Sequence, residues 1–115
     1  GADRAQQQTW PFLVIRTSSP SCVNGVYISH ENQPQRYVHN KKEIYIFTTD
    51  VWLNNRWVIA MRLDGLFVIL YENISPLIFC WASVNPDSLL PPQVGWRPLL
   101  EWLPKSIALD RFTMR

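Results

Sequence analysis

The sequence predicts a mostly β fold in one small domain, either an antiparallel meander sheet or a barrel-like domain with an irregular, Pro-rich C-terminal tail. Short runs rich in β-branched and aromatic residues alternate with Pro, Gly, Asn and Asp, as in strands joined by turns. The 115 residues, 47% of them hydrophobic, suffice for one core and not for two. We therefore expect a flexible N-terminal lead-in at residues 1–9 and a single β domain at residues 10–115.

Seven runs have the residue composition typical of β-strands. They cover residues 12–16, 23–29, 35–39, 43–49, 56–63, 66–72 and 77–82. Asp64-Gly65 lies between two of these runs and predicts a tight hairpin, because both residues readily adopt positive φ angles.

The two-residue period of a strand predicts which side chains enter the core. In residues 43–49 both alternating sets are apolar or aromatic, which indicates a central strand covered on both faces. In residues 56–63 one alternating set is expected to face the core. That set is Trp57, Ile59, Met61 and Leu63.

The C-terminal region is expected to be irregular, because its prolines remove backbone donors. Short helical turns are predicted at residues 99–102 and 107–111, the second starting at Ser106. Trp96 and Trp102 are expected to pin this tail to the sheet.

The sequence contains few residues of the types that catalysis requires. His30 and His39 are the only histidines, and no local signature accompanies either of them or Cys22. Closely spaced metal ligands and a glycine-rich phosphate loop are also missing from the sequence. We therefore predict a protein that is not an enzyme and that needs no metal and no cofactor.

Charge and cysteine content limit which classes of partner and which cellular compartment we expect. The net charge of +2 is scattered, and only Lys41-Lys42 forms a basic pair, so nucleic-acid binding is not expected. No apolar run reaches the roughly 20 residues that a membrane span requires. Cys22 and Cys80 are predicted to be unpaired thiols, which suggests an intracellular, cytoplasmic protein.

Residues 50–56 hold the main candidate contact residues. Trp52 lies in a predicted connection, where it is either displayed or tucked under the sheet, and Arg56 follows at its margin. The leading hypothesis is a protein-interaction or scaffolding domain. The alternative is a glycan-binding module, in which Trp and Tyr stack on sugar rings while Asn, Asp and Arg bind hydroxyls. The candidate residues are Asp50, Trp52, Asn54, Arg56, Arg36 and Tyr37.

Four short motifs follow one another in a recognisable order. They are Asn24-Gly25-Val26-Tyr27, Arg36-Tyr37-Val38, Trp57-Val58-Ile59 and Gly95-Trp96. Across residues 21–98 this order resembles a small β module that recurs in multidomain proteins of protists and algae. The resemblance implies a non-enzymatic accessory domain of a larger eukaryotic protein, and it brings no catalytic residue or ligand. The sequence departs from the module at residues 64–76, where a strongly apolar run replaces small residues and tyrosine.

Overall fold

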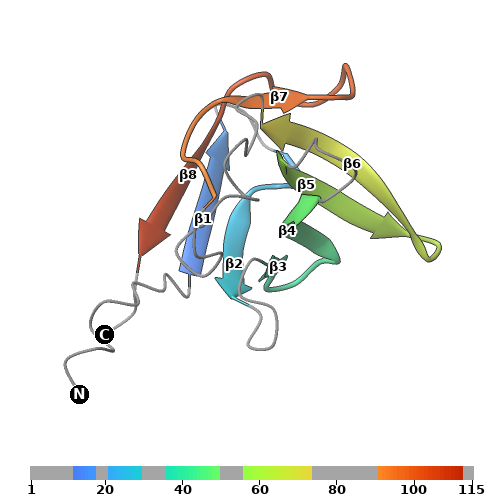
Figure 1. The fold of residues 1–115 in the computed structure, drawn as a ribbon, viewed down its shortest axis with the longest axis horizontal. Helices are drawn as coiled ribbons and strands as arrows, with labels where there is room; N and C mark the ends of the chain where they lie inside the picture. The colour runs from blue at the N-terminus through green and yellow to red at the C-terminus, as the bar shows by residue number, and fades with distance from the viewer. Residues whose placement is uncertain (1–11, 18–20, 30–35, 50–55, 74–90, 113–115) are drawn as a thin grey trace, which may run out of the picture.

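The computed structural model describes residues 12–17, 21–29, 36–49, 56–73 and 91–112. These residues form antiparallel strands in one nearly closed, barrel-like sheet, in the order β7-β6-β5-β4-β3-β2-β1-β8 (Figure 1). The strands are β1 (Phe12–Thr17), β2 (Gly25–Ser29), β3 (Arg36–His39), β4 (Ile44–Thr49), β5 (Arg56–Leu63), β6 (Leu66–Asn73), β7 (Trp96–Pro98) and β8 (Ile107–Phe112). The predicted all-β, barrel-like fold is confirmed.

Strands β1 to β6 follow the predicted runs to within two residues at either end. The seventh predicted run, residues 77–82, lies outside the described residues. Each neighbouring pair from β1 to β6 is antiparallel and consecutive in the chain, with only two to seven residues between one strand and the next. The meander therefore follows from the local order of strands and turns.

The predicted hairpin joins β5 to β6. Asp64 and Gly65 form its turn with φ angles of 53° and 80°, both in the left-handed region. The hairpin extends away from the rest of the sheet in Figure 1. Leu63, predicted to face the core, is 53% exposed, because at this distance from the interior its side chain has nothing to pack against.

The C-terminal region corrects two expectations. Residues 107–112 form strand β8 rather than a helical turn, because they pair along the whole of β1. Residues 96–98 form the short strand β7 beside β6. Residues 99–103 turn without forming a helix, and Leu103 N donates to Leu100 O over 3.2 Å.

Backbone contacts draw the two ends of the sheet together. Leu109 N of β8 donates to Gln93 O, just before β7, over 3.0 Å. Trp96 is buried and its indole Nε1–H donates to Pro92 O over 2.8 Å. Trp96 thus pins the segment before β7 to the sheet as predicted, whereas Trp102 is 64% exposed and does not.

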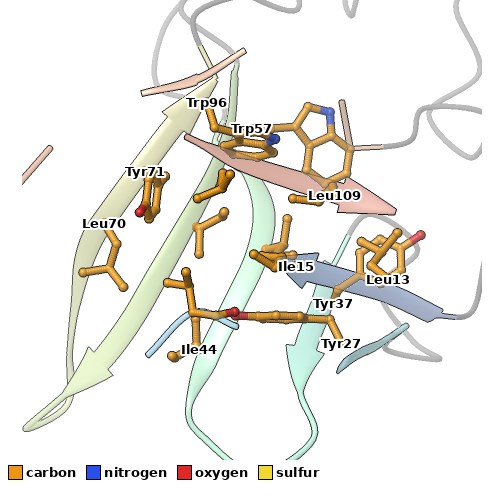
Figure 2. Packing of buried hydrophobic residues seen from close by; sticks show 14 of the residues in the cluster. Leu13, Ile15, Tyr27, Tyr37, Ile44, Trp57, Leu70, Tyr71, Trp96 and Leu109 are labelled. Atoms are coloured by element: carbon orange, nitrogen blue, oxygen red, sulfur yellow. The ribbon is translucent and has the colours of Figure 1, made fainter. Parts of the chain in front are cut away.

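The interior is filled by large side chains from the inner faces of the strands (Figure 2). Trp57 and Ile59 are fully buried in it, and Met61 packs against its edge, which confirms most of the predicted core face of β5. Two buried tyrosines keep their hydroxyls satisfied by backbone carbonyls. Tyr27 Oη donates to Val23 O over 2.7 Å, and Tyr71 Oη donates to Pro104 O over 2.6 Å.

Candidate functional site

The outer face of β3 to β6 holds the densest group of half-exposed aromatic side chains among the described residues. Strand pairing places Arg36 opposite Phe47, Val38 opposite Tyr45, and Phe67 opposite Arg62. These residues alternate with the core residues of the same strands and so point away from the interior.

Arg36 sits among three aromatic rings on this face. Its Cζ lies 5.1 Å from the Phe47 ring centroid, 5.4 Å from that of Tyr45 and 5.9 Å from that of Phe67. The Phe67 ring meets Tyr45 and Phe47 edge to face, at centroid distances of 5.5 and 5.6 Å. We call Arg36, Tyr45, Phe47 and Phe67 the Arg36 cluster. Its guanidinium and rings attract one another because the ring faces are electron-rich.

The Arg36 cluster rests beside a buried apolar floor. Val58 pairs with Phe47 on one side and with Glu72 on the other, and Ala60 pairs with Tyr45 and Ile69. Both floor residues are fully buried although they lie outside the core cluster. β4 lies in the middle of the sheet as predicted, but only its inner face is fully covered, because Tyr45 and Phe47 on its outer face are half-buried.

An ion-pair group lies at the other end of the floor. Glu72, only 8% exposed, forms ion pairs with arginines on both neighbouring strands. Arg56 Nε lies 2.9 Å from Glu72 Oε1, an ion pair without the direction of a good hydrogen bond, and Arg97 Nη2 contacts Glu72 Oε2. One carboxylate therefore ties β5, β6 and β7 together on the outer face.

The structure separates the residues that the sequence suggested as a contact surface. Arg36 and Arg56 both lie on the outer face, at the cluster and at the ion-pair group. Tyr37 lies in the core instead, because it follows Arg36 on the same strand and points to the opposite face. The remaining candidates lie outside the described residues. They are Asp50, Trp52 and Asn54.

Sequence reasoning missed the aromatic part of the cluster. Tyr45 and Phe47 were assigned only to a covered face, and Phe67 was read as part of an apolar run. The alternation of β4 does place Tyr45 and Phe47 on one side. Only the pairing of β3 with β4 shows that Arg36 shares that side, and only the β5–β6 hairpin brings Phe67 to it.

His39 has a structural role. Its Nδ1 accepts from the backbone N–H groups of Lys41 and Lys42 over 3.0 and 3.1 Å, so the ring proton lies on Nε2. Nε2–H donates to Asn24 O over 3.0 Å. All of the ring's polar atoms are engaged with backbone, so the ring holds the β3–β4 turn and the start of β2 together. His30 lies outside the described residues.

Other kinds of site find no support in the part of the chain that is described. No group of three His, Cys, Asp or Glu side chains there could hold a metal ion. No helix there is long and apolar enough to cross a membrane. Cys22 is a free, half-buried thiol, and Cys80 lies outside the described residues.

Comparisons with protein-family models, curated proteins and solved structures found no match to this chain.

Proposed function

We propose that this chain is a non-catalytic protein-binding domain, of the scaffolding kind, and that the Arg36 cluster is the centre of its contact surface. It would serve as an accessory domain in a larger intracellular eukaryotic protein, in keeping with the free thiol of Cys22. The observation that carries the proposal is the placement of Arg36 within 6 Å of three aromatic rings on an outward-facing sheet surface.

Residue type and exposure both favour contact with a protein. Arg, Tyr and Phe are enriched at interface centres, where aromatic rings bury much area at little entropic cost. Phe67 is 45% exposed, so a partner has apolar surface to remove from water. The Arg36 guanidinium lies within 6 Å of each ring centroid, which leaves less room for the stacking that sugar rings and bases require.

Among the described residues, those of the inner face form no competing contact surface. The residues that would line a ligand cavity in a barrel are fully buried against one another, among them Trp57, Tyr27 and Tyr71 (Figure 2). Binding on the outer face leaves that core intact.

The test is quantitative affinity capture with matched variants. Immobilised wild-type chain, Phe67→Ala and Trp102→Ala are compared, the last being an exposed aromatic residue outside the cluster. We expect a protein that wild type and Trp102→Ala retain equally and that Phe67→Ala retains at least about tenfold less. A partner held equally by all three chains would place the contact surface elsewhere. Retention of defined oligosaccharides instead of proteins would favour glycan binding.

A further inference from the structure

Most of the arginines with described side chains lie on the outer face described above. Four of the five arginines whose side chains are described project from it, and Arg16 on β1 is the fifth. They come from β3, from both ends of β5 and from β7. They are Arg36, Arg56, Arg62 and Arg97. We call them the arginine face.

The arginine face carries a strong charge imbalance. Glu72 is the only acidic residue that the described strands contribute to it, which gives four positive charges to one negative. The turns at its end do not change the balance, because Lys41 and Lys42 are matched by Glu43 and Asp64. The net charge of the whole chain, +2, conceals this segregation.

We infer that the partner of this surface is an extended protein segment that presents carboxylates and large apolar side chains on one face; this rests on the proposed protein-binding function. Arg56 and Arg62 stand at opposite ends of β5, about 20 Å apart at the rise of a strand. A single small anion cannot reach both. An extended segment of about six residues can.

The chemistry of the face favours carboxylates. Glu72 already occupies a position between Arg56 and Arg97, which shows that the spacing of arginines on adjacent strands accommodates a carboxylate.

The apolar part of the segment has a matching surface. Phe67 lies directly opposite Arg62 on the neighbouring strand, and both are exposed. A segment bearing only charge would leave Phe67 in water, whereas one that also presents apolar side chains on the same face covers it.

The experiment measures fluorescence anisotropy with a labelled peptide in which pairs of glutamates alternate with pairs of leucines, so that each face of the extended peptide carries both residue types. Its control is the same peptide with glutamine in place of glutamate. Arg62→Glu is compared with Arg16→Glu, an equal charge reversal at an exposed residue of β1, which β2 separates from the arginine face. We expect the glutamate peptide to bind more tightly, and its affinity to fall when salt rises from about 50 to about 300 mM. Arg62→Glu should weaken binding about tenfold and Arg16→Glu less than about twofold.

Three outcomes would overturn the inference. The first is equal binding of the glutamate and glutamine peptides, and the second is an equal effect of the two charge reversals. The third is tighter binding of single-stranded oligothymidine than of the glutamate peptide, which would point to a nucleic acid. If any of these occurs while Phe67→Ala still lowers capture of a protein as described above, the acidic-partner inference fails and the protein-binding proposal stands.

Discussion

The two faces of the same strands use aromatic residues in opposite ways. On the inner face Trp57, Tyr27 and Tyr71 are fully buried, and both tyrosine hydroxyls donate to backbone carbonyls. On the outer face Tyr45 and Phe67 remain partly exposed and surround a guanidinium. Aromatic content alone therefore does not indicate a binding surface. What distinguishes the outer face is that its rings share the surface with unburied arginines.

The largest expected effect on stability comes from removing a large side chain from the inner face. Trp57→Ala should lower the free energy of unfolding by about 3 to 5 kcal/mol, because it leaves a large cavity in the core. Chemical denaturation followed by circular dichroism measures this.

Trp57→Phe is the matched control for that variant. It keeps most of the ring and removes an indole N–H that has no hydrogen-bond partner within the described residues, so its cost should be clearly smaller. Equal costs for the two variants would show that the cavity does not determine the effect of Trp57→Ala.

Most of the inner face was predictable from sequence, because it depends on local alternation. The pattern of residues 56–63 assigned Trp57 and Ile59 to the core before any pairing was known. Strand β8 was not predicted, because its short run contains good helix formers and Ser106 resembles a helix cap. What makes it a strand is pairing with β1 at the other end of the described chain, as in Thr17 with Ile107.

The outer face was less predictable for the same reason. Arg36 was singled out from the sequence, but its neighbours come from β4 and β6 through strand register. The arginine face is also invisible in a linear charge count, because its members are separated along the chain and meet only across strands. A surface whose residues become neighbours only through strand register can be recognised only once the fold is known.

An intermediate effect should appear at alkaline pH. Burial, with a smaller contribution from nearby Cys22, raises the pKa of Tyr71 to about 12, and burial raises that of Tyr27 further. Unfolded tyrosines lose their protons near pH 10, so above that pH the unfolded state binds fewer protons than the folded state. Stability should therefore be unaffected by these groups below about pH 9. It should fall between about pH 10 and 12 by up to about 1.4 kcal/mol per pH unit for each tyrosine.

Unfolding at a series of pH values, for wild type and Tyr71→Phe, tests this. The variant loses the bond to Pro104 O at every pH, but its alkaline decline should be shallower, since one of the two shifted groups is gone. Parallel curves would mean that the Tyr71 hydroxyl is not held neutral by the fold.

The smallest expected effect concerns the outer face and is the sharpest test of the contrast between the two faces. Phe67→Ala should lower the free energy of unfolding by only about 1 kcal/mol, because the ring is 45% exposed and leaves no enclosed cavity. Its loss removes one of the three rings around Arg36, an interaction of about 0.5 to 1 kcal/mol at an exposed site. Denaturation measured beside Trp57→Ala gives the comparison directly. A Phe67→Ala cost approaching that of Trp57→Ala would make the Arg36 cluster a second packed core, whereas a small cost leaves its rings available to a partner.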